Sequence, residues 1–371
     1  MSSICLDKQI LLQISMKKTN KRIFFTENLL FWNAAHNARI MPWKGEKDPY
    51  RIWLSEIILQ QTRVEQGLAY YNRFISQYPT VSLLAAAPEN DVFKLWEGLG
   101  YYSRCRNLIA SARYIAFDLN GNFPESYEEI LKMKGVGPYT AAAISSFAYN
   151  LPHAVVDGNV LRVLARFFGI DLPIDSNEGK KYFTELAQAL LDKGSPSLYN
   201  QAIMDFGATI CKPQLPLCAT CVLQKECIAF NSGRVSELPV KEKKLKKRNR
   251  FFYYVIAEFN DKIYVRKRTE KDIWQSLFEF KLFEKEEKIT PEELLDSPEL
   301  KIFAGKQLKV QSISKFYKQQ LTHQSIEGIF IHIILSEPPA EGEMVPIEKS
   351  RIGALAFPRF MTRFFEERQS F

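Results

Sequence analysis

The stretch MKGVGPYTAAAI, residues 133–144, decides how the first part of the chain folds. Gly135 and Gly137 stand two residues apart directly before an alanine-rich apolar run, a pattern typical of a tight turn that joins two helices. Such a turn leaves backbone N–H groups at the start of the second helix free to bind a phosphate oxygen, without reading nucleotide sequence. Glycine turns before helices are also common structural features, so this stretch alone leaves both interpretations open.

The surrounding region, residues 22–210, is expected to be all-α. Ser126 and Glu129 have the form of a capping box just before the glycine turn, and alternating strand-like patterns are scarce. Apolar positions recur at helical spacing in seven segments, separated by Gly, Pro and Asn: 23–35, 53–75, 105–119, 139–149, 158–168, 180–191 and 197–210.

The length of 371 residues favours two or three domains, and a hydrophobic fraction of 46% is ample for packed cores. Strand-like segments rich in aromatic and β-branched residues, such as FFYYVIAEF and GIFIHIIL, appear only after residue 250 and predict a second domain of α+β type. The expected organisation is a loose N-terminal tail at 1–21, a helical domain at 22–230, a basic linker at 231–249 and the α+β domain at 250–371.

The formal net charge of +8 comes mostly from residues 241–250, KEKKLKKRNR, which carry seven basic groups and one acid. This run either attracts a polyanion or is a solvated linker, and the rest of the chain is close to balanced. No stretch approaches the roughly 20 apolar residues that span a bilayer. We therefore expect no membrane partner and a cytoplasmic location, associated with the nucleoid if the protein is bacterial.

Four of the six cysteines, Cys211, Cys218, Cys221 and Cys227, lie within 17 residues with the spacing C-x6-C-x2-C-x5-C. In a reducing compartment such a set indicates metal binding rather than disulfides. Four thiolates suit either zinc or a [4Fe-4S] cluster, but structural zinc sites more often consist of two short C-x2-C pairs separated by a longer loop. A single compact loop favours the [4Fe-4S] cluster.

Two carboxylates are candidates for acid–base chemistry. Glu56 stands within the apolar run LSEIILQQTR (54–63), where a carboxylate is costly unless it has a partner or a function. Asp157 directly precedes Gly158 in VVDGNVLRVLARFFG (155–169), where it either caps the following helix or forms a pair with Glu56.

The segments PWKGEKDPYRIWLSEIILQQTRV, LWEGLGYYSRCRNL, LKMKGVGPYTAAAI, VVDGNVLRVLARF and YNQAIMDFGATIC, together with the cysteine loop, resemble the MutY-type adenine DNA glycosylases of the helix-hairpin-helix superfamily. The resemblance extends in order from about residue 22 to 230 and more faintly to the end. It implies a [4Fe-4S] cluster on the four cysteines, and a duplex DNA substrate in which adenine faces 8-oxoguanine or guanine.

The resemblance also implies roles for individual residues. Glu56 is the expected catalytic acid, and an ionised Asp157 stabilises the sugar cation, either electrostatically or through a transient covalent adduct. Residues that match the family's adenine pocket are Trp43, Tyr139, Asn159 and Gln201. Residues expected to probe or wedge the base stack are Gln60, Gln61 and Tyr101.

Tyr139 predicts that the enzyme does not cut the DNA strand efficiently. Related endonuclease III-like enzymes have a lysine at this hairpin position, which forms a Schiff base with the sugar. The expected enzyme is therefore a monofunctional glycosylase. The alternatives are an endonuclease III-like pyrimidine glycosylase and lyase, and a non-catalytic iron-sulfur protein that binds damaged DNA.

The C-terminal region resembles the Nudix-like domain with which the family recognises 8-oxoguanine. No Nudix box of clustered glutamates is present, so pyrophosphate hydrolysis is not expected. Where family members have Phe-Ser-His, this chain has Leu321, Thr322 and His323. The hydroxyl and the imidazole are kept, whereas the aromatic wedge is lost. We expect a monomer whose repair or replication partners the sequence does not identify.

Overall fold

The computed structural model describes residues 3–242, 247–303, 308–339, 342 and 344–368. The chain divides into two compact units, Met1–Gln60 with Tyr114–Lys243, and Gln61–Arg113 with Lys244–Phe371. Residues 243–246 of the predicted basic linker lie outside the described residues.

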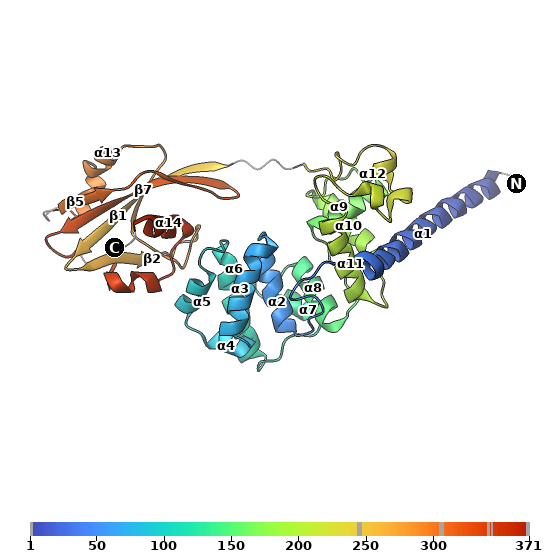
Figure 1. Cartoon of the computed structure of the whole chain (residues 1–371), viewed down its shortest axis with the longest axis horizontal. Coiled ribbons are helices and arrows are strands. Elements are labelled where there is room, and N and C mark those ends of the chain that lie inside the picture. Colours follow the sequence, from blue (N-terminus) through green and yellow to red (C-terminus); the bar gives the residue numbers. More distant parts are fainter. Residues whose placement is uncertain (1–2, 243–246, 304–307, 340–341, 343, 369–371) are drawn as a thin grey trace. The chain divides into compact units, whose positions relative to one another are not determined.

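The first unit is helical, as predicted (Figure 1). Its longer helices are α1 (Ser3–His36), α2 (Pro49–Leu59), α8 (Pro138–Tyr149), α9 (Gly158–Phe168), α10 (Asn177–Leu190) and α11 (Pro196–Thr209). Its short helical elements are the π-helix η1 (Tyr114–Asp118), α7 (Tyr127–Leu131), η2 (Cys218–Thr220), η3 (Gln224–Glu226) and α12 (Ile228–Asn231).

Helix α1 begins at Ser3, within the segment 1–21 that was predicted as a loose tail. The segment contains neither proline nor glycine, so no residue in it forces the helix to start later. The core of this unit is formed where α1, α9, α10 and α11 bury apolar side chains such as Phe25, Leu164 and Phe206.

The second unit begins with four helices: α3 (Val64–Gln77), α4 (Val81–Ala86), α5 (Glu89–Trp96) and α6 (Tyr102–Arg113). The helical run predicted over 53–75 is interrupted between α2 and α3, where Gln61 has a φ of 54°. Helices α4 and α5 were not predicted, because segments of six and eight residues are too short for a clear period.

These four helices are joined to the C-terminal domain by polar contacts with its backbone. Lys94 donates to the carbonyl of Leu355 at 3.1 Å, and Glu97 accepts from the N–H of Phe357 at 2.8 Å. Arg106 donates to a carbonyl of the same domain, that of residue 275, at 2.6 Å. Residues 61–113 consequently belong to the same compact unit as the C-terminal domain, so the region predicted as one helical domain at 22–230 is not one compact unit.

The C-terminal domain is built on a mixed sheet of eight strands in the order β3-β2-β1-β7-β5, with β4 beside β1, β6 beside β7 and β8 beside β2. Its central strands β1 and β7 run parallel, and the other pairings are antiparallel. The strands are β1 (Arg248–Phe259), β2 (Lys262–Lys267), β3 (Phe278–Glu279), β4 (Lys281–Lys285), β5 (Leu308–Ile313), β6 (Tyr317–Gln320), β7 (Gln324–Leu335) and β8 (Val345–Glu348). Its helical elements are α13 (Pro291–Leu295), η4 (Pro298–Phe303), η5 (Lys349–Ala354) and α14 (Arg359–Arg368).

Both faces of this sheet are covered, so β1 and β7 are apolar almost throughout. On one face Tyr253 and Val255 pack with Leu294 of α13. On the other face Phe330 stacks on Phe364 of α14, with ring centroids 4.2 Å apart. The predicted α+β domain is confirmed.

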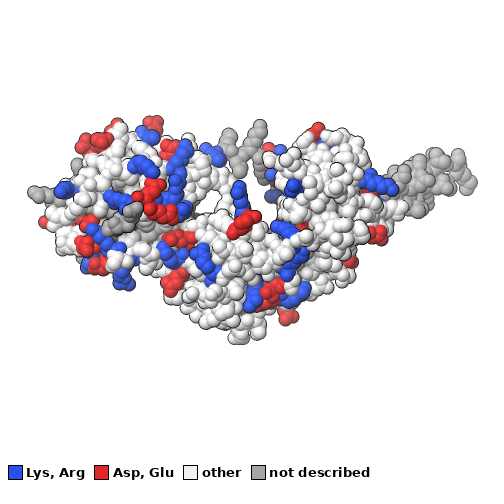
Figure 2. All heavy atoms as spheres, in the orientation of Figure 1, with Lys and Arg blue, Asp and Glu red and all other residues white. Residues whose placement is uncertain are grey.

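Lys and Arg are interspersed with Asp and Glu on the face of the molecule drawn in Figure 2. Within the part of the chain that is described, no helix has the length and apolar character needed to cross a bilayer.

Candidate active site

Glu56 lies in the middle of α2, where every residue from Ile52 to Ile58 is buried. Its neighbours Trp53 and Leu54 are fully excluded from solvent, and Glu56 itself is only 8% exposed. Burial disfavours the charged carboxylate and raises the pKa of Glu56 to about 7. A large fraction of Glu56 side chains therefore carries a proton at neutral pH.

Tyr139 lies in the first turn of α8, directly after the predicted glycine turn. Gly135 has a φ of 78°, which glycine adopts without strain, and Gly137 is the N-cap of α8 with open space where a side chain would stand. Because α8 packs against α2, the hydroxyl of Tyr139 reaches Glu56 and donates a hydrogen bond to it. This bond favours the ionised carboxylate, but the burial of Glu56 has the larger effect on its pKa.

Asp157 is both the N-cap of α9 and a neighbour of Glu56. One carboxylate oxygen accepts from the backbone N–H groups of Asn159 and Val160, both at 2.8 Å, and the other accepts from the Asn159 amide at 2.7 Å. Burial raises the pKa of Asp157, although these hydrogen bonds favour its charged form. The charge of Asp157 in turn helps to raise the pKa of Glu56, so the two carboxyl groups lie in one site. Asp157 therefore both caps α9 and forms a pair with Glu56, so the two interpretations of this residue apply at the same time.

The orientation of Asn159 is fixed by Arg162. The guanidinium donates to the Asn159 side-chain oxygen at 2.9 Å, to the carbonyl of Gly207 at 2.8 Å and to the carbonyl of Cys211 at 2.8 Å. A Cβ atom on Gly207 would lie 2.7 Å from the Cβ of Asn159, so only glycine lets α11 approach this closely. Arg162 thus connects the residue beside Asp157 to the first cysteine of the loop.

Sequence reasoning missed Arg162 and Arg166. A signal was present, because two arginines four residues apart lie on one face of the otherwise apolar helix α9. Both are buried, and an arginine is rarely buried unless its donors are used. Such a pair indicates carbonyl or carboxylate partners supplied by another segment.

The cysteine loop begins beside Arg166. This guanidinium lies 3.6 Å from the sulfur of Cys211 and donates to the carbonyls of Lys212 and Pro213 at 2.7 and 3.2 Å. Burial raises the pKa of the Cys221 thiol to about 12, and the charges of the other three cysteines of the loop add to this shift. The four sulfurs therefore lie within electrostatic range of one another, although no three His, Cys, Asp or Glu side chains of the described residues form a ready metal-binding group.

The remaining predicted pocket residues, Trp43 and Gln201, and the predicted stack-probing residues Gln60 and Gln61 occupy separate positions. Gln60 follows α2, and its amide donates to the Thr140 hydroxyl of α8 at 3.2 Å. Trp43 is partly buried in the turn before α2, and Gln201 is partly buried on α11. Gln61, at the first residue of the second unit, is exposed with a left-handed backbone.

Two predicted DNA-reading residues touch each other in the second unit. Tyr101 is 43% exposed and adopts a φ of 48°. Its hydroxyl lies 2.6 Å from the Thr322 hydroxyl, and its ring is covered by the Arg104 guanidinium at 5.2 Å. Thr322 lies in the three-residue loop of the β6–β7 hairpin, next to the exposed His323. The structure therefore brings Tyr101 and Thr322 together.

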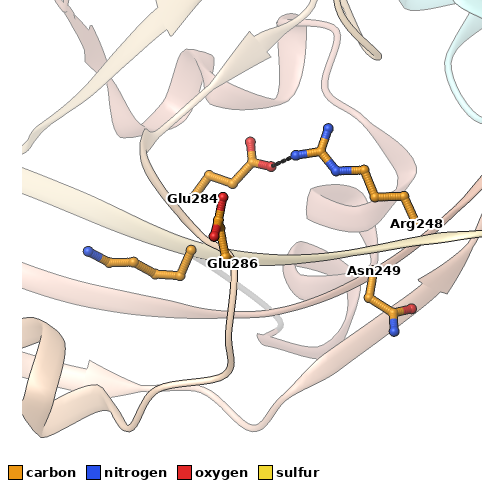
Figure 3. A pocket seen from close by; sticks show the side chains of 5 residues that line it. Arg248, Asn249, Glu284 and Glu286 are labelled. Carbon is orange, nitrogen blue, oxygen red and sulfur yellow. Dashed lines mark ion pairs between the residues drawn. The ribbon is translucent and has the colours of Figure 1, made fainter.

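A surface hollow in the same unit contains none of the predicted site residues. It is lined by Arg248, Asn249, Glu284, Lys285 and Glu286, and Arg248 and Glu284 approach to 3.8 Å across it (Figure 3). Both charges are present in its lining, so it has no clear preference for an anion or a cation.

Two protein families match the chain, one in its helical part and one in its C-terminal domain. The family described as HhH-GPD superfamily base excision DNA repair protein matches residues 54–192, and the NUDIX domain family matches residues 252–367. The first match includes Glu56, Tyr139 and Asp157, and the second includes Thr322 and His323.

Individual proteins give the same result. An adenine DNA glycosylase of Buchnera aphidicola subsp. Schizaphis graminum is 33% identical over 315 residues, which cover 84% of this chain and 88% of that protein. One of Buchnera aphidicola subsp. Baizongia pistaciae is 34% identical over 70% of this chain and 74% of that protein. The rat adenine DNA glycosylase is 41% identical over 58% of this chain and 44% of its own length. Among solved structures, a thermostable thymine-DNA glycosylase is 31% identical with a TM-score of 0.54, covering 58% of this chain and 99% of that one.

Proposed function

The chain belongs to the adenine DNA glycosylase family, and on this premise we propose that it removes adenine paired with 8-oxoguanine or guanine and leaves an abasic site. The enzyme is a DNA N-glycosylase of base excision repair, and its substrate is duplex DNA. The observation that carries the proposal is the site itself. A buried glutamate with a pKa of about 7 lies beside an aspartate and hydrogen-bonds to a tyrosine.

The first step is access to the base, because an adenine stacked in a duplex cannot reach a buried carboxyl group. The nucleotide has to rotate out of the helix, and another group fills the gap it leaves. Gly135 and Gly137 before α8 offer backbone N–H groups to a phosphate at the start of this helix. Tyr101 and Gln61, both exposed with left-handed backbones, are the candidates for entering the base stack.

Glu56 acts as the general acid that protonates the departing adenine. The protonated purine is a far better leaving group than the anion that would otherwise form. Because burial raises the pKa of Glu56 to about 7, the proton is available near neutral pH and is still acidic enough to be transferred. The hydrogen bond from Tyr139 holds the carboxyl in place and stabilises the carboxylate that remains after transfer.

Asp157 stabilises the positive charge that develops on the sugar. An ionised carboxylate is favoured here by three hydrogen bonds and by the positive end of the α9 dipole. In a partly buried site such an anion stabilises an oxocarbenium-like transition state more strongly than it would in water. Asn159, fixed by Arg162, keeps the carboxylate in one orientation.

Tyr139 also accounts for a monofunctional reaction. Strand cleavage by a lyase needs an amine that forms a Schiff base with the sugar. Burial and the neighbouring carboxylates raise the pKa of Tyr139 well above its ordinary value, so the side chain is a neutral phenol with no amine function. Water adds to the anomeric carbon of the sugar cation and loses a proton, so the product is an intact strand with an abasic site.

A strand-break assay tests this proposal. We expect a duplex with adenine opposite 8-oxoguanine to show breaks only after alkali, because alkali cleaves the abasic site that the enzyme leaves. Breaks without alkali on a duplex with an oxidised pyrimidine would instead indicate a glycosylase and lyase, and absence of base release would indicate a binding protein. Either result would contradict the proposal.

Recognition of the opposite base is assigned to the second unit. The hairpin loop Leu321–Thr322–His323 presents a hydroxyl and an imidazole, and Tyr101 contacts this hydroxyl. 8-Oxoguanine differs from guanine by an added oxygen and an added N–H group. A polar side chain that hydrogen-bonds to one of these two groups can therefore distinguish 8-oxoguanine from guanine. We expect Thr322→Ala to lower the preference for 8-oxoguanine over guanine.

The four cysteines are proposed to hold a [4Fe-4S] cluster. Four thiols on one short loop, within electrostatic range of one another, fit a group that requires four thiolates. Arg166 supplies a cation beside Cys211 and binds the backbone of the loop. When bound, the cluster holds the loop in one conformation. No chemical step of base removal requires it.

Metal analysis checks this assignment without an activity measurement. Protein purified without oxygen is expected to be brown and to contain about four iron atoms per chain. Replacing Cys221 by serine should remove the colour and the iron. Colourless protein with one zinc ion per chain would contradict the iron-sulfur assignment and leave the glycosylase proposal untouched.

A further inference from the structure

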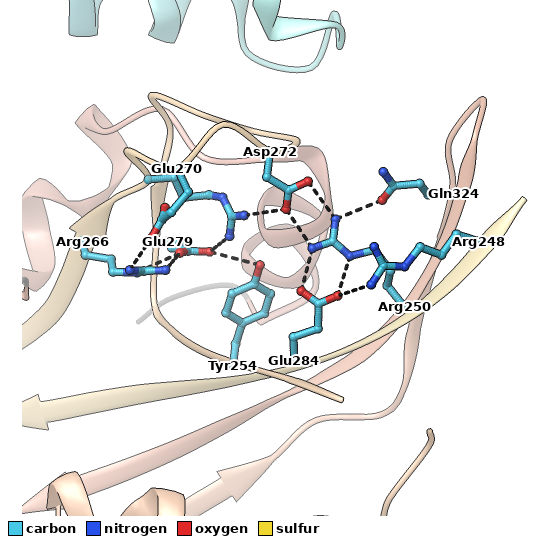
Figure 4. Close-up of polar contacts among 10 residues, drawn as sticks. Arg248, Arg250, Tyr254, Arg266, Glu270, Asp272, Glu279, Glu284 and Gln324 are labelled. Atoms are coloured by element: carbon cyan, nitrogen blue, oxygen red, sulfur yellow. Dashed lines mark hydrogen bonds and ion pairs between the residues drawn. The ribbon is translucent and has the colours of Figure 1, made fainter. Parts of the chain in front are cut away.

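The guanidinium of Arg250, near the start of β1, lies at the centre of a polar network that ends at the base-reading hairpin (Figure 4). Arg250 is 6% exposed, and its ring of partners comes from three segments. These partners are Glu284 of β4, Asp272 of the loop before β3, and Gln324, the first residue of β7. Glu284 also lines the hollow of Figure 3, so the network reaches solvent on that side.

All five N–H donors of Arg250 can be assigned to acceptors. Glu284 accepts at 2.7 and 2.6 Å, Asp272 accepts at 3.0 and 2.8 Å, and the Gln324 side-chain oxygen accepts at 3.1 Å. Two of these pairings are bidentate, a geometry that fixes the guanidinium plane. Because the plane is fixed by the carboxylates, the position of the N–H offered to Gln324 is fixed as well.

Gln324 is also the residue that closes the hairpin loop. Its carbonyl accepts from the N–H of Leu321 at 2.7 Å, which closes the loop Leu321–Thr322–His323. The neighbouring strand holds the loop as well, because the N–H of Arg248 donates to the carbonyl of His323 at 3.0 Å. The Gln324 side chain is therefore anchored to Arg250 and its backbone to the loop.

We propose that Arg250 and Gln324 are positioning residues that set the preference for 8-oxoguanine over guanine. The inference rests on the proposed function. Thr322 stands two residues before Gln324, and its hydroxyl discriminates only if it is held at hydrogen-bond distance from the base. In this chain Leu321 replaces the aromatic wedge expected from the family, so placement of the Thr322 hydroxyl depends on the anchored hairpin and on the contact with Tyr101.

The test uses Gln324, because removing Arg250 would take the buried partner from Glu284 and one of two buried arginines from Asp272, and would threaten folding. Gln324→Met keeps the size of the side chain and removes the acceptor. The matched control is Arg266→Gln, which disturbs the same network at Glu279 and Glu270, two carboxylates that lie outside the hairpin. Rates of adenine release are measured opposite 8-oxoguanine and opposite guanine, below the melting temperature of each variant.

We expect Gln324→Met to lower the ratio of the two rates at limiting enzyme by about tenfold, the effect of one hydrogen bond. On the 8-oxoguanine duplex, the variant should need a higher enzyme concentration for its half-maximal rate, whereas its rate at saturating enzyme should stay close to that of wild type. Arg266→Gln should keep the wild-type ratio even where it lowers the melting temperature.

Each outcome decides the matter. A Gln324→Met variant with the wild-type ratio, or with the same loss as Arg266→Gln, would overturn the inference. If wild-type enzyme prefers 8-oxoguanine and Thr322→Ala loses that preference while Gln324→Met keeps it, only the inference fails. If wild-type enzyme shows no preference at all, the proposed reading of the opposite base fails, and the inference fails with it.

Discussion

Glu56→Gln is expected to slow adenine release by about 10³-fold, because a positioned general acid contributes roughly 10²–10⁴-fold. Glutamine has the shape of glutamic acid and still offers an oxygen to the hydroxyl of Tyr139. It has no proton to give to the purine. The measurement is a single-turnover rate on a duplex with adenine opposite 8-oxoguanine, with enzyme in excess.

The same variant should bind this duplex about as tightly as wild-type protein, since glutamine keeps the shape of the side chain and the phosphate contacts proposed for the glycine turn do not involve Glu56. A variant that bound normally and released adenine at more than a tenth of the wild-type rate would contradict the assigned role. Loss of binding with an intact fold would equally count against it.

Stability gives the Glu56 prediction a second readout. The pKa of Glu56 is raised from 4.5 to about 7 in the folded protein, so folding becomes less favourable as pH rises from 4.5 to 7. Well above pH 7 the penalty levels off at roughly 3 kcal/mol. Glu56→Gln should therefore raise the melting temperature at pH 8 relative to wild type and have little effect at pH 4.5, which thermal melts at the two pH values measure.

Asp157→Asn is expected to slow adenine release by about 10²–10³-fold, the usual effect of removing one electrostatic stabiliser of a transition state. The asparagine oxygen can still accept from the N–H groups of Asn159 and Val160, so α9 keeps most of its N-cap. The substitution removes the negative charge that stabilises the sugar cation, so the rate falls although the helix cap is kept. Single-turnover rates on the same duplex check the effect.

A capping control separates charge from structure. Ser176→Ala removes the side chain that caps α10, a different helix from those that carry the two carboxylates, through the N–H of Gly179 at 2.9 Å. It should cost about 1 kcal/mol of stability and leave the rate of adenine release near that of wild type. Equal losses of rate in Asp157→Asn and Ser176→Ala would show that Asp157 is only a cap.

Parts of this site were accessible from the sequence for physical reasons. The apolar residues on both sides of Glu56 predicted its burial, and the two glycines before α8 predicted the turn that carries Tyr139. That Tyr139 and Asp157 would approach Glu56 could not follow from spacing. They lie about 80 and 100 residues further along the chain, and only the family resemblance brought them into one site.

Other features depend on long-range contacts that leave no local pattern. Arg162 acts through carbonyl groups of Gly207 and Cys211, and every residue supplies a carbonyl, so no sequence signal marks the partner. The same holds for Lys94, whose acceptor is the carbonyl of Leu355. This contact helps to explain why helices α3 to α6, which were predicted to be part of the first domain, belong to the same compact unit as the second domain.

The network around Arg250 was missed for a different reason. Its acids and bases come from separate segments of the chain, each of which also fits an ordinary solvated surface. Only the register of β1 beside β7, with Arg248 opposite Gln324, places Arg250 under the hairpin. Strand register is set by the whole sheet and cannot be derived from one strand.

The pH dependence of the single-turnover rate tests the central claim most directly, namely that protonated Glu56 gives its proton to adenine. Since the protonated form is active, the rate should fall with rising pH above an apparent pKa near 7, by about tenfold per pH unit. The residual rate of Glu56→Gln should lack this fall. A wild-type rate that stays constant from pH 6 to pH 9 would contradict the account.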